Sequence, residues 1–180
     1  MDVQGVLETD QLAVWTIGHS TRTLEDFITV LTTYRIEALV DVRRFPGSRR
    51  LPHFHGATLA EALGARCISY YWLEALGGRR RPDPQSLNVA WRQPAFRAYA
   101  DYLATEEFAD ALWDLLMIAS GLRTAIMCAE VLWWRCHRRL IADVLTSLDV
   151  PVVHIRDERA AETHRLVPPA RMVNGVLTYA

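Results

Sequence analysis

The sequence predicts an α/β protein with a mostly parallel central sheet flanked by helices and a possible hairpin near the C-terminus. Short apolar runs of strand length alternate along the chain with segments of helical periodicity, which is the pattern of right-handed βαβ units. The 180 residues, of which 51% are hydrophobic, suffice to bury a core without disulfides. We expect a single domain over residues 13–180, after an N-terminal extension over residues 1–12 and with a hairpin or tail after residue 165.

The predicted strands are segments rich in apolar, β-branched or aromatic residues. They cover residues 13–17, 37–42, 67–73, 124–130 and 151–155. Near the C-terminus, Asn174-Gly175 stands between two apolar pairs, which is the signal of a type I′ hairpin turn.

Between these strands, apolar residues recur at helical spacing and follow N-cap signals. Thr23 with Asp26 and the single Thr105 are N-cap signals, and Thr58 with Glu61 forms a better capping box. The predicted helices cover residues 24–31, 58–65, 95–104, 106–119 and 136–148.

The composition excludes several kinds of chemistry and location. All 20 basic residues are Arg, so the chain has no P-loop lysine, Schiff-base lysine or lysine general base. No apolar run approaches the ~18 residues of a membrane span, and the acidic start MDVQGVLETD is unlike a signal peptide. The three cysteines, Cys67, Cys128 and Cys136, have no disulfide-framework spacing. We therefore expect a cytoplasmic protein with no membrane partner.

Charge is unevenly distributed, although the whole chain has a net charge of −1. Residues 41–97 contain ten Arg and four acids, a balance of +6, whereas the other 123 residues contain ten Arg and 17 acids. This segment predicts a cationic face on an otherwise acidic protein.

Ionisable residues gather where three of the predicted strands end. The groups are Gly18-His19-Ser20-Thr21-Arg22, then Asp41-Val42-Arg43-Arg44, then Cys128-Ala129-Glu130 followed by Cys136-His137-Arg138. In open α/β sheets, ligands bind beyond the carboxyl ends of the strands. The sequence therefore predicts a functional site at this edge of the sheet.

Five segments that include these groups carry a resemblance to a known family. They are TIGHS (16–20), LVDVRRFPGSRR (39–50), LGG (76–78), CAE (128–130) and CHRRLIA (136–142). Together and in this order they resemble the family called domain of unknown function 488, over about Trp15 to Ile155. The resemblance implies an α/β fold in a cytosolic prokaryotic protein, and it supplies positions for a site without a reaction.

The arginines at the strand ends offer planar, bidentate donors that suit phosphate. The predicted anion-binding residues are Ser20, Arg43, Arg44, Arg79 and Arg138. Because side chains alternate along a strand, Asp41 and Arg43 share a face. Asp41 either orients this arginine for a ligand or forms a structural ion pair with it.

The candidate catalytic residues are His19, Asp41, Glu130, Cys136 and His137. His19 follows a buried strand and a glycine, and neutral imidazole accepts a proton near pH 7. We weigh a role as general base or ligand against a ring that merely hydrogen-bonds the next loop.

The cysteine cluster allows three interpretations. Cys136 at a helix N-terminus, beside His137, has the surroundings of a nucleophilic thiol with a lowered pKa. Alternatively Cys128, Cys136 and His137 bind a metal, with Glu130 as a further donor, although the C-x2–4-C spacing of common zinc sites is missing. Third, Cys128 is a core residue and Glu130 pairs with Arg138.

Other motifs give weaker signals. A strand followed by Asp-Val-Arg is similar to the opening of sulfurtransferase domains, but Trp134 and Ala142 stand where cysteine-dependent phosphatases place the arginine of C-x5-R. His53 and His55 have no clear metal partner. Trp133 and its neighbour Trp134 either stack on bases or dock a helix.

Two functions follow from these features, and no cofactor is specified. The first is an enzyme acting on a phosphate-bearing substrate, a nucleotide or nucleic acid, with an arginine-lined anion site and His19 and Glu130 as acid–base residues. The alternative is a non-catalytic module that binds nucleic acid or a nucleotide through the same arginines.

Overall fold

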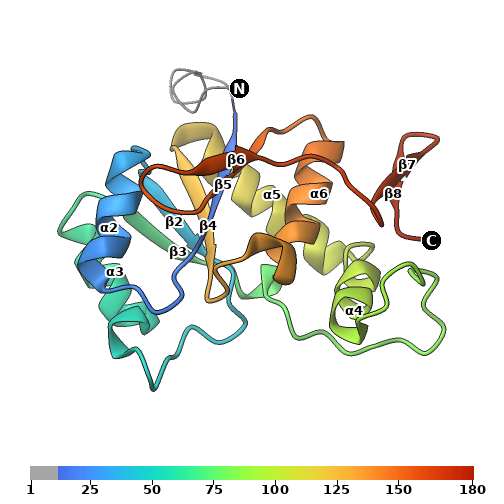
Figure 1. Cartoon of the computed structure of the whole chain (residues 1–180), viewed down its shortest axis with the longest axis horizontal. Helices are drawn as coiled ribbons and strands as arrows, with labels where there is room; N and C mark the ends of the chain where they lie inside the picture. The colour runs from blue at the N-terminus through green and yellow to red at the C-terminus, as the bar shows by residue number, and fades with distance from the viewer. Residues whose placement is uncertain (1–11) are drawn as a thin grey trace.

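The computed structural model describes residues 12–180 and has the predicted α/β architecture (Figure 1). Six strands form one sheet in the order β3-β2-β4-β1-β5-β6, in which only β6 is antiparallel to its neighbour. The strands are β1 (Val14–Gly18), β2 (Ala38–Asp41), β3 (Ser69–Trp72), β4 (Thr124–Cys128), β5 (Val152–Ile155) and β6 (Ala161–Thr163). The five predicted strands are thus confirmed, whereas the short edge strand β6 was not predicted.

Five α-helices and three short 3₁₀ helices connect and cover the strands. The α-helices are α2 (Leu24–Thr33), α3 (Gly56–Gly64), α4 (Pro94–Tyr102), α5 (Glu106–Gly121) and α6 (Arg138–Ser147). The 3₁₀ helices are η1 (Pro52–Phe54), η2 (Glu74–Leu76) and η3 (Trp133–Arg135). Within residues 12–180, no helix combines the length and the apolarity that a bilayer crossing requires.

Two of the three predicted N-caps are present. The hydroxyls of Thr23 and Thr105 accept hydrogen bonds from the backbone N–H three residues on, at the starts of α2 and α5. The predicted capping box at Thr58 is wrong, because α3 begins earlier, after His55, whose side chain makes no capping bond. The backbone N–H of Gly56 instead donates to the carbonyl of Pro46, so a tertiary contact sets this helix start.

The predicted C-terminal hairpin is confirmed as β7 (Arg171–Val173) and β8 (Val176–Thr178). Asn174 and Gly175 join the two strands and have φ values of 51° and 79°, as a type I′ turn requires. The predicted N-terminal extension lies almost entirely outside the described residues.

The helices cover the two faces of the sheet separately (Figure 1). Helices α2 and α3 bury Phe27, Leu59 and Leu63 against one face, together with Trp15 of β1. Helices α4, α5 and α6 bury their apolar sides on the other face. The sheet is therefore covered on both sides, as parallel sheets generally are, and its carboxyl edge is where polar groups can reach a ligand.

The strand order brings the candidate segments together at this edge. Strand β4 lies between β1 and β2, so the loops after all three strands leave the sheet side by side. The chain leaves β1 for α2 on one face, and it leaves β4 for α6 on the opposite face. Such a divergence between neighbouring strands opens the crevice in which doubly wound folds bind their ligands.

Candidate active site

A cavity of about 550 Å³ lies beyond the carboxyl ends of β1, β2 and β4. This volume is in the range of small-molecule sites, about 300–1,000 Å³. Eight of the residues predicted from the sequence line it: His19, Arg43, Arg44, Arg79, Cys128, Glu130, Cys136 and His137. Helix α4 closes one side with Phe96 and Tyr99. The loops after β1, β2 and β4 were expected to meet here, and the loop after β3 contributes Arg79, a predicted anion-binding residue.

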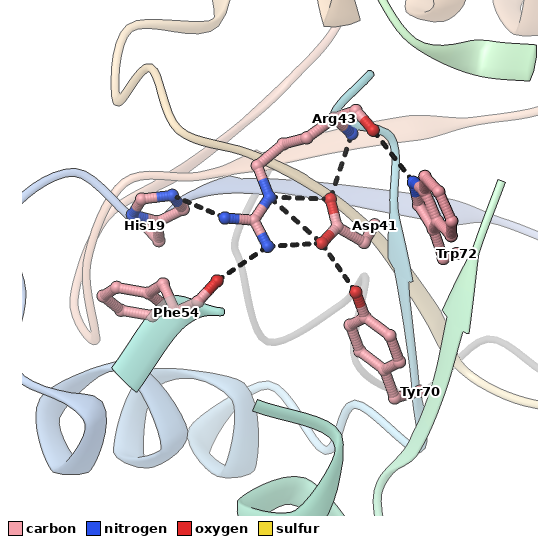
Figure 2. Close-up of polar contacts among 6 residues, drawn as sticks. All are labelled: His19, Asp41, Arg43, Phe54, Tyr70 and Trp72. Atoms are coloured by element: carbon pink, nitrogen blue, oxygen red, sulfur yellow. Dashed lines mark hydrogen bonds and ion pairs between the residues drawn. The ribbon is translucent and has the colours of Figure 1, made fainter. Parts of the chain in front are cut away.

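A buried ion pair lies at the end of β2 (Figure 2). The guanidinium of Arg43 donates from Nε to Asp41 Oδ1 at 2.9 Å and from Nη2 to Oδ2 at 2.5 Å. Tyr70 of β3 adds a hydroxyl bond to Oδ2 at 2.8 Å, and the Arg43 backbone N–H donates to Oδ1 at 3.0 Å. Asp41 does not line the cavity, so its carboxylate positions Arg43.

Arg43 keeps one donor for a ligand. Of its five N–H bonds, Nη2 also donates to the carbonyl of Phe54 at 2.9 Å, and Nη1 lies 3.4 Å from Nε2 of His19 (Figure 2). These partners and Asp41 account for four of the five within the described residues. Because Arg43 lines the cavity in one fixed orientation, the remaining N–H of Nη1 can be donated to a ligand there.

His19 is held as a neutral ring. Its Nδ1 lies 2.9 Å from the carbonyl of Ser20, so Nδ1 carries the proton and Nε2 accepts from Arg43. The ring stacks on Phe54 at 4.2 Å. Burial, with a smaller effect from the Arg43 charge, lowers the pKa of His19 to about 4. Both ring nitrogens are thus hydrogen-bonded within the protein, and the lone pair of Nε2 is already shared with Arg43.

Glycines allow the strand-end loops to approach closely. A Cβ at Gly18 would overlap the carbonyl oxygen of Glu130 and lie 2.6 Å from Cα of Val131. A Cβ at Gly77 would lie 2.8 Å from the backbone of Arg44. These two glycines belong to the TIGHS and LGG segments, so close packing of the loops explains why glycine stands there.

Cys128, Cys136 and His137 converge on the cavity wall. Their ligand atoms all lie within 4.8 Å of one another, and Sγ of Cys136 is 3.6 Å from Nδ1 of His137. The hydrogen bond from Cys128, and then the nearby charge of Arg138, hold the pKa of Cys136 well below its usual range. The same thiol pairing, with burial, raises the pKa of Cys128. Of the two thiols, Cys136 is therefore the one that loses its proton more readily.

Arg138 lies behind this cluster and does not line the cavity. It is almost fully buried, and its Nε lies 3.4 Å from Sγ of Cys136. Its Nη2 donates to the main-chain carbonyl of Glu130, not to the carboxylate, whose Oε1 accepts from the backbone of Leu132 at 3.1 Å. The prediction of an ion pair between Glu130 and Arg138 is therefore wrong, because among the described residues Arg138 bonds the main-chain carbonyl of Glu130 and the carboxylate bonds the backbone of Leu132.

The remaining arginines of the cavity lie nearer its mouth. Arg44 pairs with Glu74 at 3.3 Å, and both side chains are partly solvent-exposed. Arg79 lies over the ring of Phe45, with 5.7 Å from its Cζ to the ring centroid. Arg135 also lines the cavity and is exposed. The walls thus carry four arginines and one carboxylate.

Some residues singled out in the sequence lie elsewhere. Ser20 does not line the cavity, and it contributes the carbonyl that fixes His19. His53 bonds the carbonyl of Arg22 at 3.0 Å, and His55 is exposed before α3. The contributions of Arg135 and of helix α4 to the cavity were missed, although the helix itself was predicted and Arg135 directly precedes the CHRRLIA segment.

The tryptophan pair packs instead of facing the cavity. Trp133 stacks on His154 at 4.0 Å with an interplanar angle of 6°, and its indole N–H donates to Glu162 at 2.7 Å. Trp134 lies edge-on to Trp133 and is partly exposed. Of the two alternatives, the geometry of Trp133 is that of a packing residue.

A buried hydrogen-bonded chain under Trp133 was not predicted. Thr16 Oγ1 lies 2.7 Å from Nδ1 of His154, whose Nε2 is 2.9 Å from Nδ1 of His164. His164 Nε2 is 2.9 Å from one oxygen of Asp143, and Tyr179 donates to the other at 2.9 Å. Burial, then the neighbouring His164, lowers the pKa of His154 to about 2. Arg138 reaches Thr16 at 3.4 Å, so the chain ends behind the cysteine cluster.

The family model described as domain of unknown function DUF488 matches residues 23–145, more than half of the chain. The chain belongs to this family. The match confirms the resemblance read from the sequence and contains the cysteine cluster and all four arginines of the cavity. No curated protein and no solved structure matches this DUF488 member.

Proposed function

We propose that this DUF488 protein is an enzyme acting on a phosphate-bearing substrate that binds in the cavity. The observation that carries the proposal is the composition of the walls: four arginines and one carboxylate surround a thiol pair and an imidazole. Arginine forks match the geometry of phosphate oxygens and bind them bidentately. Reactive groups beside a preformed anion site are the arrangement of a catalytic centre.

The arginines of the cavity differ in how firmly the protein holds them. Arg43 is fixed by Asp41 and His19, and it offers one oriented N–H at the inner end of the site. Arg44 is held by a partly exposed ion pair and Arg79 by an aromatic contact. Because exposed ion pairs contribute little, about 0–1 kcal/mol, a phosphate can replace Glu74 as the partner of Arg44 at small cost.

The candidate acid–base groups have unequal support. His19 uses both nitrogens within the protein, which favours a role in holding Arg43 and the substrate over proton transfer. Glu130 lines the cavity with one oxygen bonded to the backbone. Cys136 and His137 lie directly against each other at the wall, so we place the chemistry there.

The non-catalytic alternative has one observation of its own. Phe45 lines the cavity, is 63% exposed and packs beside Arg79, which is the pairing that single-stranded nucleic acids use for stacking and phosphate contact. A binding module would hold oligonucleotides with a log–log salt slope of about −0.7 per phosphate for a single strand.

Paired ligands test the anion site. We expect ribonucleoside monophosphates, and not the matching nucleosides, to raise the thermal midpoint and to give a binding isotherm by calorimetry. Arg44→Ala and Arg79→Ala each weaken this binding about 10-fold or more, because each removes a hydrogen bond to a charged group. Arg66→Ala is the control, since Arg66 is exposed and outside the cavity.

Turnover separates the two functions. The enzyme is supported if the wild-type protein releases inorganic phosphate or converts the nucleotide to another product, and if the His137→Gln variant does not. Tight oligonucleotide binding with the expected salt slope and no product supports the module. Equal affinity for a nucleoside and its monophosphate would overturn the phosphate proposal in both forms.

A further inference from the structure

We propose that Cys128 Sγ, Cys136 Sγ and His137 Nδ1 form a binding site for a zinc-like divalent ion in the wall of the cavity. The inference deepens the proposed function, on which it rests for the identity of the substrate but not for the binding of the ion. The three donor atoms lie within 4.8 Å of one another. Among residues 12–180, these are the side chains that come close enough together to share a metal ion. Two thiolates with an imidazole select zinc over the hard ions magnesium and calcium.

One of the three donor separations matches that of two ligands on a tetrahedral ion. Zinc binds sulfur at about 2.3 Å and histidine nitrogen at about 2.0–2.1 Å, so two such ligands at tetrahedral angles are about 3.6 Å apart. The separation between Cys136 Sγ and His137 Nδ1 is 3.6 Å. An ion therefore enters without displacement of this pair.

The ring of His137 is oriented as a metal ligand. Its Nε2 lies 3.0 Å from the carbonyl oxygen of Val42, which can only accept, so Nε2 carries the proton and Nδ1 has a free lone pair. Metal-ligating histidines commonly fix their second nitrogen on a backbone carbonyl in this way. Tyr99 packs against the ring at 5.1 Å, and a Cβ at Gly78 would lie only 3.0 Å from Nδ1. Glycine at 78 thus keeps the lone pair accessible.

The sulfur side has a matching outer partner. Arg138 Nε lies 3.4 Å from Cys136 Sγ and is itself anchored on Thr16 and on the backbone of Glu130. A fixed N–H donor to a thiolate ligand balances part of its charge and holds its direction. With two thiolates and a divalent ion, the centre is electrically neutral before Arg138 is counted.

Three protein ligands would leave a fourth position for the ion in a cavity that arginines also line. All three ligand residues line the cavity, as do Arg43 and Arg44. Catalytic zinc sites keep an open position of this kind, whereas structural sites are closed by a fourth residue. The open position would take a phosphate oxygen or a water, and the ion would act on it as a Lewis acid.

A zinc and cobalt titration of the reduced full-length protein tests the site without any substrate. We expect binding of about one ion per chain and, with cobalt, the thiolate charge-transfer and tetrahedral d–d absorption of a sulfur-containing site. Cys128→Ser, Cys136→Ser and His137→Gln should each weaken zinc binding by more than the about 10- to 100-fold that loss of an outer partner costs. Cys67→Ser and His55→Gln are matched controls, because both residues are exposed and lie outside the cavity.

The competing chemistries give different results. Failure to bind zinc in competition with a weak chelator overturns the site, as does wild-type affinity in the two cysteine variants. Loss of two thiols on mild oxidation, with no metal bound after reduction, would identify a redox pair instead. The nucleotide titrations of the zinc-free protein are independent of these outcomes, so failure of the metal site and failure of the anion site are distinguishable.

Discussion

Replacement of Asp41 by Asn should strongly destabilise the protein, because it leaves a buried arginine without its counter-charge. Asp41 is 0% exposed and Arg43 is 6% exposed. The carboxylate accepts from two nitrogens of the guanidinium, from the Arg43 backbone and from Tyr70. Asparagine has one acceptor oxygen and must turn an N–H₂ donor towards other donors. Breaking a buried pair from one side costs about 3–5 kcal/mol.

Urea unfolding and the thermal midpoint measure this loss. For a protein of this size, about 3–5 kcal/mol corresponds to a fall in Tm of about 6–20 °C. Glu74→Gln is the matched control, since it breaks the partly exposed pair with Arg44 and should cost less than about 1 kcal/mol.

The partner variant completes the test. Arg43→Met removes the buried cation, and the double variant with Asp41→Asn should be less destabilised than the sum of the two single variants. An Asp41→Asn protein that unfolds at the wild-type urea concentration would refute the reasoning, and so would simple additivity of the two changes. Either result would mean that the pair is solvated or that neighbouring groups replace it.

Two further predictions concern the same strand ends. Burial lowers the pKa of His19 from 6.5 to about 4. Between these two values the unfolded chain binds more protons than the folded protein, so the free energy of unfolding decreases as the pH is lowered. Between about pH 7 and about pH 5 this accounts for about 2 kcal/mol, and urea unfolding of His19→Gln should show a correspondingly flatter pH dependence; an unchanged slope contradicts the assignment. Gly18→Ala forces its Cβ onto the backbone of Glu130 and Val131 and should cost about 3 kcal/mol, whereas Gly64→Ala, with open space around it, should be nearly neutral in the same assay. Equal stability of the two alanine variants would show that the loops are loosely packed.

The sequence alone determined most of the helices and strands and the polar strand ends. Thr23 and Thr105 signal their helices because a capping hydroxyl acts on an N–H three residues away, within one turn. Asn174-Gly175 specifies its hairpin for an equally local reason, the left-handed conformation that both residues accept. The accumulation of His19, Arg43 and the cysteine segment after strands was also readable, since parallel strands share one carboxyl edge.

Only the tertiary structure decided which of these groups face one another. The placement of β4 between β1 and β2 is a long-range pairing that leaves no trace in local periodicity. The pairing of β2 with β3 likewise brings Tyr70 onto Asp41, whose carboxylate holds Arg43 and does not line the cavity, although its position in the chain is that of a site residue.

The same limit applies to contacts between distant side chains. Arg138 bonds the backbone of Glu130 instead of its carboxylate, and His154 joins His164 and Asp143 in a buried chain. Whether a hydrogen bond forms depends on its direction and on donor–acceptor distances that must be correct to a few tenths of an ångström, and a linear sequence does not contain this information. The sequence thus placed reactive groups at one edge of the sheet, and the packing of strands and loops determined which of them meet at the cavity wall.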